Sequence, residues 1–305
     1  MQVTAILCTY NRSRSLENAL KSLSVSRVPD TISWKVIVVD NNSKDDTRQV
    51  VERFVAEHPG KFLYLFEPRQ GKSFALNAGI QAADADVIAF VDDDVQVAPD
   101  WLGNLTSPLL GAGFCGVGGR ILPEAEFTPP QWMDTSGRYA LAPLAIFDLG
   151  SEPRELDEAP FGTNMAFRRQ VFDQYGGFRT DLGPRPGSEI RNEDAEFGTR
   201  ILEAGEKLWY EPRAVVYHSI STERLSKRYF LAWWFDKARA DIRQYGLPSE
   251  AKIYIFGVPG FLLLRLAAWM VRWLLAGNPR RRFSCRLKVW SVTGAIRECL
   301  AHGKG

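Results

Sequence analysis

Short apolar runs alternate with amphipathic helical patterns over the first hundred residues of the chain. Four runs are β-rich and apolar on both sides, which is typical of strands buried between two layers of helices: residues 3–9, 34–39, 62–66 and 87–91. The segments between them show helical spacing, and in the first of these Leu16, Ala19, Leu20 and Leu23 share one face. This alternation predicts an α/β fold, Rossmann-like, with a mostly parallel sheet flanked by helices.

The alternation weakens after residue 100. The pattern predicts a short helix from Asp100, a glycine-broken strand within 113–121, and a last strand at 214–217 that ends at His218. A further helix is predicted to begin at Asn192, with Asn192 as its N-cap and Gly205 as its C-cap. Residues 123–160 are rich in proline and acids, which predicts loops over a sheet edge.

Residues 222–305 differ in composition from the rest of the chain. Aromatic and basic residues are mixed up to Tyr245, and a Gly/Pro break at 257–260 leads into the apolar segment 261–276. Arg265 and Arg272 interrupt that segment, and a membrane span needs about 20 mainly apolar residues, so no spanning helix is expected. The pattern predicts an amphipathic helix in the interface of an anionic membrane. Helices that pack on the rest of the chain or in a homodimer are the alternative.

Charge is distributed unevenly along the 305 residues. The formal net charge is +2, but the segment from Arg265 onward holds nine basic residues and one acid, a net charge of +8, so residues 1–264 carry −6. A basic tail on an acidic body indicates an anionic surface as partner. The four cysteines show no CxxC spacing, which argues against a disulfide framework or a zinc ribbon. No basic n-region or cleavage site precedes the first strand, so we expect a cytoplasmic N-terminus.

Three consecutive carboxylates, Asp92, Asp93 and Asp94, follow the fourth predicted strand. In open α/β sheets ligands bind at the carboxyl ends of strands, and adjacent carboxylates repel one another unless a cation holds them, so we expect a divalent ion here. Two phosphate-binding motifs are excluded. Gly71-Lys72-Ser73 lacks the glycine that a Walker A loop needs five residues earlier, since position 66 is Phe, and no G-x-G-x-x-G follows the first strand.

Several short segments, each at a predicted strand end or helix start, together resemble the family 2 glycosyltransferases, which are inverting nucleotide-sugar enzymes with a GT-A fold. The segments occur in the family's order: Cys8-Thr9-Tyr10-Asn11-Arg12, Asp40-Asn41-Asn42-Ser43, Gly71-Lys72-Ser73 with Leu76-Asn77-Ala78-Gly79, Asp92-Asp93-Asp94, Gly162-Thr163-Asn164-Met165, Asn192-Glu193-Asp194 and His218. The resemblance implies a GT-A catalytic domain at 1–221, with a nucleotide-binding half at 1–100 and an acceptor and catalytic half at 101–221. The basic, aromatic-rich helical extension 222–305 follows it. Processive members carry Q-x-x-R-W, whereas residues 269–273 read Trp-Met-Val-Arg-Trp, so we expect single transfer.

The resemblance also implies roles for single residues on the donor side. Asp40 would receive the nucleotide base, with Thr9 and Arg12 lining the same pocket, and Asp92 would face the nucleotide. Asp94 and His218 would ligate Mn²⁺ or Mg²⁺, and imidazole favours a transition ion over Ca²⁺; a histidine satisfied within the core is the alternative for His218. Lys72 is a candidate for the diphosphate or, alternatively, an exposed loop residue. Asp93 joins these donor-binding acids without a role of its own.

On the acceptor side the resemblance assigns Asp194 as the catalytic base. Residues 162–165, including Gly162 and Asn164, would form the floor of the sugar and acceptor site. Glu193 stands beside Asp194 in the first turn of a helix, where the helix dipole favours ionised acids, and physical argument from the sequence does not separate the two. Inverting transfer needs a base for the acceptor hydroxyl and a cation for the departing diphosphate, and these residues offer both.

We therefore expect a metal-dependent, inverting glycosyltransferase that is cytoplasmic and peripheral on the inner face of the membrane. It would move a sugar from a nucleotide donor, a UDP-sugar, to a lipid-linked or polysaccharide acceptor, without binding nucleic acid. Two alternatives stay open: a nucleotidyltransferase acting on a sugar phosphate, and a non-enzymatic membrane-binding module. The first normally has a Gly-rich basic loop after its first strand, whereas this chain has Tyr10-Asn11-Arg12.

Overall fold

The computed structural model describes residues 1–305 except 112, 137–138, 189, 248–252 and 303–305. Two compact units are present. Unit 1 consists of Met1–Ala125, Ala145–Thr180 and Glu193–Ser219, and unit 2 consists of Glu126–Leu144, Asp181–Asn192 and Ile220–Gly305. Parts of the predicted C-terminal extension, 248–252 and 303–305, lie outside the described residues.

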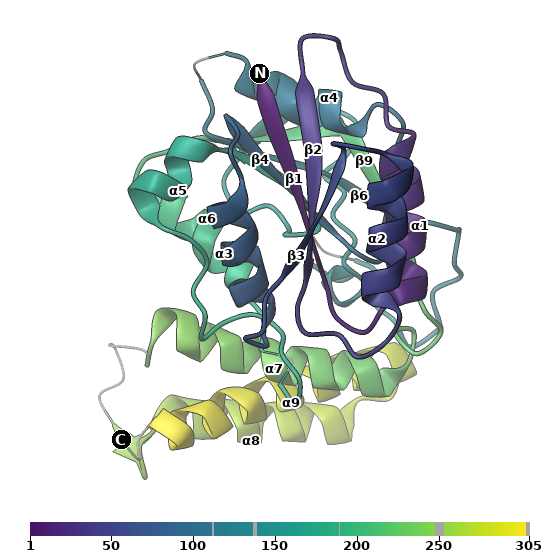
Figure 1. Cartoon of the computed structure of the whole chain (residues 1–305). Coiled ribbons are helices and arrows are strands. Elements are labelled where there is room, and N and C mark those ends of the chain that lie inside the picture. Colours follow the sequence, from purple (N-terminus) through teal and green to yellow (C-terminus); the bar gives the residue numbers. More distant parts are fainter. Residues whose placement is uncertain (112, 137–138, 189, 248–252, 303–305) are drawn as a thin grey trace. The chain divides into compact units, whose positions relative to one another are not determined.

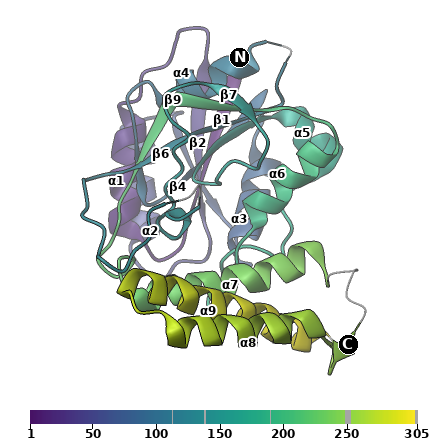
Figure 2. The ribbon, with the colours of Figure 1, turned by 180° about the vertical axis from the view of Figure 1, so that it is seen from behind.

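The first half of unit 1 has the alternating architecture that the sequence predicts. Its parallel strands are β1 (Gln2–Thr9), β2 (Ser33–Asp40), β3 (Phe62–Phe66) and β4 (Val87–Asp92), and the helices between them are α1 (Ser13–Ser24), α2 (Thr47–Glu57) and α3 (Lys72–Ala82). The helices α1 and α2 lie on one side of these strands and α3 on the other, as Figures 1 and 2 show. The apolar face predicted for the first helix, Leu16 to Leu23, is buried.

The second half of unit 1 extends the sheet with strands of both directions. These are β5 (Val95–Val97), β6 (Gly116–Pro123), β7 (Arg154–Leu156), β8 (Asn164–Arg168) and β9 (Leu208–His218), in the order β3-β2-β1-β4-β8-β6-β9-β5 with β7 also paired to β9. The helices are α4 (Trp101–Thr106), α5 (Arg169–Tyr175) and α6 (Glu193–Glu203). Strands β6 and β9 run parallel to the first four, and β5, β7 and β8 run antiparallel, so the described sheet is mostly parallel, as predicted. The expectation of loops alone over 123–160 missed β7, which at three residues is too short to show a pattern.

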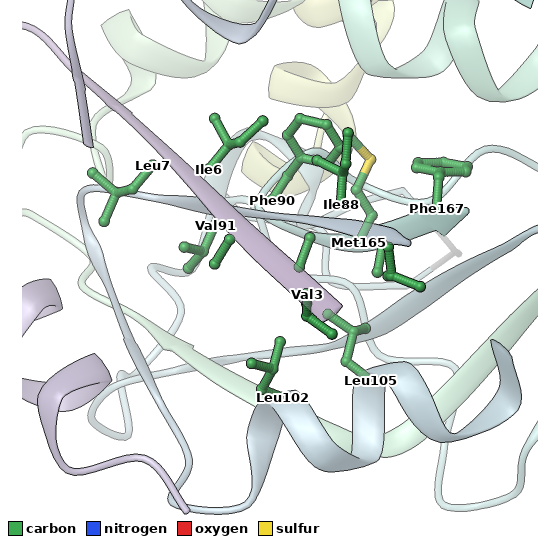
Figure 3. Packing of buried hydrophobic residues seen from close by; sticks show 14 of the residues in the cluster. Val3, Ile6, Leu7, Ile88, Phe90, Val91, Leu102, Leu105, Met165 and Phe167 are labelled. Carbon is green, nitrogen blue, oxygen red and sulfur yellow. The ribbon is translucent and has the colours of Figure 1, made fainter. Parts of the chain in front are cut away.

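Buried hydrophobic side chains in the core of unit 1 fix the positions of the strands β1 and β4. Figure 3 shows Val3 of β1 beside Leu102 and Leu105 of α4, and Ile6 near Phe90 of β4. All of these side chains are at most 1% exposed. Burying one such side chain stabilises a fold by about 1.5–3 kcal/mol, so β1 and β4 are anchored on both faces. The residues that follow them therefore start from rigid positions.

The two ends of α6 differ in how well the sequence predicts them. At the C-terminal end the N–H of Gly205 donates to the carbonyl of Leu202, and the N–H of Glu206 donates to that of Ile201, with Gly205 at φ +88°. This is the glycine-terminated end that was predicted. At the N-terminal end Asn192 has φ +77°, outside the extended region that N-cap residues adopt. Its side-chain amide donates to Asp241 and Gln244 instead, so the N-cap prediction for Asn192 is wrong.

The described part of unit 2 contains three α-helices, a short hairpin and a 3-10 helix at Ala142–Leu144. The α-helices and strands are α7 (Lys227–Tyr245), β10 (Tyr254–Ile255), β11 (Val258–Pro259), α8 (Gly260–Leu275) and α9 (Pro279–His302). The helix α9 packs against both α7 and α8, and the three lie side by side in Figure 1. A buried glutamate of α9, Glu298, accepts hydrogen bonds from Arg239 and Arg243 of α7. Among the described residues, no helix combines the length and hydropathy needed to traverse a bilayer.

Candidate functional site

The carboxyl ends of β1, β2 and β4 meet at one edge of the sheet. Parallel register places Cys8 opposite Asp92 and Thr9 opposite Asp40. After Asp92 the chain turns through Asp93 and Asp94 and enters β5, which pairs with β9 and not with β4. The three acids therefore lie where the chain crosses from one part of the sheet to another, at the edge where open α/β sheets bind ligands.

Asp94 and His218 are neighbours because of strand pairing. Val95 is the register partner of His218, and the N–H of Ser219 donates to the carbonyl oxygen of Asp94 at 3.1 Å. Asp94 Oδ2 lies 3.4 Å from His218 Nε2. Two ligand atoms each about 2.1 Å from one ion, subtending roughly 105°, are about 3.3 Å apart, so this pair fits a divalent cation. No group of three or more His, Cys, Asp or Glu with metal-binding geometry occurs in the part of the chain that the structure describes.

Asp93 is buried and is held by residues near the end of β1. Its Oδ2 accepts from Thr9 Oγ1 at 2.7 Å, its Oδ1 accepts from Arg12 Nη1 at 3.0 Å, and its carbonyl oxygen accepts from Ser15 Oγ at 2.8 Å. The same Arg12 nitrogen is 3.2 Å from Asp94 Oδ2. Burial raises the pKa of Asp93 to about 6, although Arg12 opposes the rise. Thr9 and Arg12 thus hold the acid cluster together, and Asp93 has a structural role that the sequence did not indicate.

Lys72, the first residue of α3, joins two acids from distant parts of the chain. Its Nζ lies 2.8 Å from Asp92 Oδ1 and 3.6 Å from Glu193 Oε1, and its side chain is only 24% exposed. The alternative of an exposed loop residue is therefore wrong for Lys72. Thr163 Oγ1 donates to Asp92 Oδ2 at 2.7 Å. Burial disfavours the charged form of Asp92, but the Lys72 charge and these hydrogen bonds outweigh it and hold the pKa of Asp92 below its ordinary value.

Glu193 and Asp194 begin α6 side by side but have different surroundings. Glu193 is buried, and burial together with the charge of Asp194 raises its pKa to about 7 against the opposing effect of Lys72. Asp194 is partly exposed, and its Oδ2 accepts from the N–H of Gly162 at 2.7 Å. A Cβ atom at position 162 would lie 3.1 Å from that oxygen, so glycine leaves room for the carboxylate. The accessible acid of the pair is Asp194, which separates two residues that the sequence left equivalent.

Asp40 is buried at the end of β2 and is fixed by two neighbours. Its Oδ1 accepts from the N–H of Ser43 at 2.9 Å, which is a turn-forming contact, and its Oδ2 accepts from the hydroxyl of Tyr64 at 2.8 Å. The next residue, Asn41, binds the loop before α3, because its amide donates to the carbonyls of Glu67 and Arg69 and accepts from the N–H of Gly71. These contacts hold the second and third strand ends in register.

Asn164 lies in the protein core, whereas the resemblance places it in the floor of the sugar and acceptor site. Its side chain is fully buried, accepts from Trp101 Nε1 at 2.8 Å and donates to the carbonyls of Arg120 and Ala214. The Asn164 amide therefore joins β8 to α4, β6 and β9. Thr163, the residue before it, carries the contact to Asp92 that sequence reasoning did not assign. The signal available was its position beside Gly162, at the start of a strand next to the acid cluster.

Comparison with known proteins agrees with this arrangement. The family model described as glycosyl transferase family 2 matches residues 4–176. The chain is 30% identical over 228 residues to the succinoglycan biosynthesis protein ExoM of Rhizobium meliloti, covering 74% of this chain and 68% of ExoM. It is 26% identical over 224 residues to the glucosyl-dolichyl phosphate glucuronosyltransferase of Haloferax volcanii, covering 72% of this chain and 70% of that protein.

The fold is also that of a solved glycosyltransferase. The mannosyltransferase PcManGT of Pyrobaculum calidifontis, solved in complex with GDP-Man and Mn²⁺, superposes with a TM-score of 0.58 at 21% identity, covering 99% of this chain and 74% of that one. Together with the mixed α/β sheet flanked by helices, this likeness supports the predicted GT-A fold. The extent of the family match and the identity to ExoM go beyond fold: the chain is a glycosyltransferase and belongs to glycosyl transferase family 2.

Proposed function

We propose that this enzyme transfers a sugar, with inversion and with the help of a divalent metal ion, from a UDP-sugar to a lipid-linked or polysaccharide acceptor. The observation that carries the proposal is one cluster at the carboxyl edge of the sheet. It contains an Asp94–His218 pair of metal-binding geometry, and it contains Lys72 between Asp92 and Glu193, next in sequence to the accessible Asp194. In this proposal residues 1–100 bind the donor and residues 101–221 provide the acceptor and catalytic half.

The proposed chemistry is a single displacement. The oxygen of an acceptor hydroxyl forms a bond to the anomeric carbon while the bond from that carbon to the diphosphate oxygen breaks on the opposite face. Asp194 accepts the hydroxyl proton and Gly162 N–H orients its carboxylate, because the bond between them fixes one carboxylate oxygen. The electron pair of the broken bond leaves with the nucleoside diphosphate. The ion that Asp94 and His218 would hold supplies positive charge to this leaving group when bound.

Residues of this chain also account for recognition of the donor. Asp40 lies at the end of β2 next to Thr9, and a carboxylate there suits the imino N–H of uracil. Lys72 pairs with Asp92 and lies near Glu193, so its positive charge offsets the negative charge of these acids. A diphosphate that approaches the site would therefore meet less repulsion. Arg12 adds a second positive charge next to Asp93 and Asp94.

The names of the relatives support the acceptor class. One is a succinoglycan biosynthesis protein and the other a glucosyl-dolichyl phosphate glucuronosyltransferase, so a growing polysaccharide and a lipid-linked sugar are the acceptors to examine first. We retain the sequence-based expectation of a cytoplasmic enzyme, peripheral on the inner face of a membrane. Residues 222–305 would contact an anionic membrane surface in that setting, and a homodimer is the alternative use of these helices.

The proposal is tested by nucleotide release. The purified enzyme is incubated with Mn²⁺, a panel of UDP- and GDP-sugars and membrane-lipid extract as acceptor, and the release of UDP or GDP is followed. We expect Asp94→Ala and Asp194→Asn each to lower turnover by about 10²–10³-fold, because one removes charge stabilisation and the other the base. Asp173→Asn, at an exposed position of α5, is the matched control and retains full turnover.

Each alternative predicts its own experimental outcome. Release of pyrophosphate from UTP and a sugar 1-phosphate, without release of UDP from a UDP-sugar, would indicate nucleotidyl transfer. Turnover equal to that of the wild type in the Asp94→Ala and Asp194→Asn variants would refute the assignment of the site. Absence of nucleotide binding in calorimetry would favour a non-enzymatic binding module.

A further inference from the structure

The helix α8 exposes an apolar face. Seven residues on that side of the helix are hydrophobic and exposed: Phe261, Leu264, Ala267, Ala268, Val271, Leu274 and Leu275. Leu264 is 74% exposed and Leu275 80% exposed. At 100° per residue these positions lie within roughly 140° of one another on the helix surface. We call them the outer face of α8.

A different face of α8 makes the contacts within unit 2. Leu262, Leu266 and Trp269 pack in a cluster with Val292 and Cys299 of α9. Among the described elements, α8 packs mainly against α9 and the strand β11. A surface helix normally covers its second face with polar residues, and α8 does not, so its outer face is unexplained by the packing of unit 2.

The hairpin before α8 continues the apolar surface. It joins β10 to β11 through a two-residue turn in which Phe256 has φ +50° and Gly257 φ +78°. A phenylalanine with positive φ is strained, yet the ring is 92% exposed at the tip of the hairpin. Ile253, Tyr254 and Ile255 beside it are also exposed. Strain and exposure of an aromatic tip would be costly for a protein surface that stays in water.

The charged residues around this surface are all basic. Arg265 and Arg272 lie on one flank of α8, between its packed and outer faces, and Arg280, Arg281 and Arg282 follow at the start of α9. All five are exposed, and no acidic residue occurs from Ile253 to Arg297. Two copies joined through this face would bring these arginines together. Anionic headgroups, in contrast, would neutralise them while the acyl region accepts the apolar side chains.

We propose that the outer face of α8 and the tip of the β10–β11 hairpin insert into the surface of an anionic phospholipid membrane, with α8 lying in the plane of the interface. Phe256, Leu264 and Leu275 enter the acyl boundary, and the arginines contact headgroup phosphates. This inference deepens the proposed function by naming the surface that would bring the enzyme to a lipid-linked acceptor, but it needs no sugar chemistry to be tested.

The experiment is co-sedimentation of the full chain with vesicles of phosphatidylcholine alone or mixed with phosphatidylglycerol. We expect binding to the mixed vesicles only. The double substitution Leu264→Glu with Leu275→Glu should weaken that binding at least about tenfold, since each leucine contributes by apolar burial. The control pair Val25→Glu with Leu110→Glu changes exposed apolar residues of unit 1 by the same charge and should leave binding unchanged.

A second variant keeps the test decisive if the α8 variant misfolds. Phe256→Ser alters a side chain that is almost wholly exposed, so it should preserve the melting temperature and still reduce vesicle binding. Equal sedimentation of all variants would overturn the proposal. A lipid-free dimer that dissociates on Leu264→Glu with Leu275→Glu, without vesicle binding by the parent chain, would assign the face to a second copy. UDP release measured with the lipid extract dissolved in detergent, without vesicles, reports separately on the proposed function.

Discussion

The three consecutive carboxylates have three different sets of partners. Asp92 pairs with Lys72 and Thr163, Asp93 with Thr9 and Arg12, and Asp94 with Arg12 and His218. The sequence predicted that these acids gather at a ligand edge, because their type and strand-end position are local properties. The sequence did not predict which partners each carboxylate has. Most of these partners lie 70 or more residues away along the chain, and the pairing depends on which carboxylate is buried.

At the scale of single residues, the raised pKa of Glu193 predicts that the free energy of unfolding depends on pH. Its pKa is raised to about 7 in the folded chain from an ordinary 4.5, so the folded state retains this proton over a range where the unfolded chain has lost it. The free energy of unfolding should therefore receive a contribution that is full below about pH 4.5 and lost as pH rises towards 7. Chemical denaturation of wild type and Glu193→Gln at several pH values measures this, and the variant should lack that part of the decline.

Glu155→Gln, which removes a half-exposed carboxylate of unit 1, is the control and should keep the wild-type slope. If Glu193→Gln and wild type lose stability in parallel between pH 4.5 and 7, Glu193 is ionised throughout and the assignment of its raised pKa fails. Activity gives an independent reading. Glu193→Gln should retain more turnover than Asp194→Asn, because Asp194 is the accessible acid.

At the scale of elements, α7 fixes the segment that leads into Glu193 and Asp194, the proposed catalytic pair. Leu182 and Ile190 pack with Ala240, Arg191 lies over the ring of Trp233, and Asn192 donates to Asp241 and Gln244. Hydrophobic periodicity predicted the existence of α6 and its glycine-terminated end, since both are set by residues within the helix. The start of α6 next to Asn192 was predicted correctly, but the capping role of Asn192 was not, because its side-chain amide donates to residues of α7.

This arrangement predicts the effect of Asn192→Asp. The substitution keeps the shape of the side chain but places a carboxylate 2.8 Å from Asp241 and from the Gln244 oxygen, without a donor. We expect a loss of about 1–3 kcal/mol in the free energy of unfolding, and a lower kcat with little change in UDP affinity, since the donor residues are elsewhere. Denaturation, steady-state kinetics and calorimetry measure the three quantities.

The double variant Asn192→Asp with Asp241→Asn is the matched control. It restores one donor and one acceptor with their positions exchanged, and should recover part of both the stability and the kcat. Recovery of stability without recovery of kcat would mean that Asn192 stabilises unit 2 but does not influence the catalytic pair.

At the scale of the whole molecule, the proposed metal site couples ion and nucleotide binding. Asp94 and His218 are the two ligands proposed for the ion among the described residues, so a diphosphate can take coordination positions that water fills in its absence. Mn²⁺ and UDP added together should therefore stabilise the protein more than the sum of their separate effects, by a coupling free energy of about 1–3 kcal/mol. Thermal melting with each ligand and with both measures this coupling.

Asp94→Ala should abolish the extra stabilisation and leave any effect of UDP alone in place. Simple additivity in the wild type would show that ion and nucleotide bind independently, contrary to the proposed site.

The uneven charge of the molecule was visible in the sequence, because it is a property of composition. The membership of 126–144 and 181–192 in unit 2 was not, because it depends on contacts such as those of Trp132 with Phe230 and Phe283.

The interleaving of the two units limits how this enzyme can be divided. The chain passes between them five times, at residues 125/126, 144/145, 180/181, 192/193 and 219/220. Truncation at the end of β9 would remove the helices and leave Trp132, Leu182 and Ile190 without the side chains they pack against. Unit 2 is thus not an exchangeable module at the C-terminus. Its helices and the two inserted segments would have to be transplanted together in any chimaera with a relative.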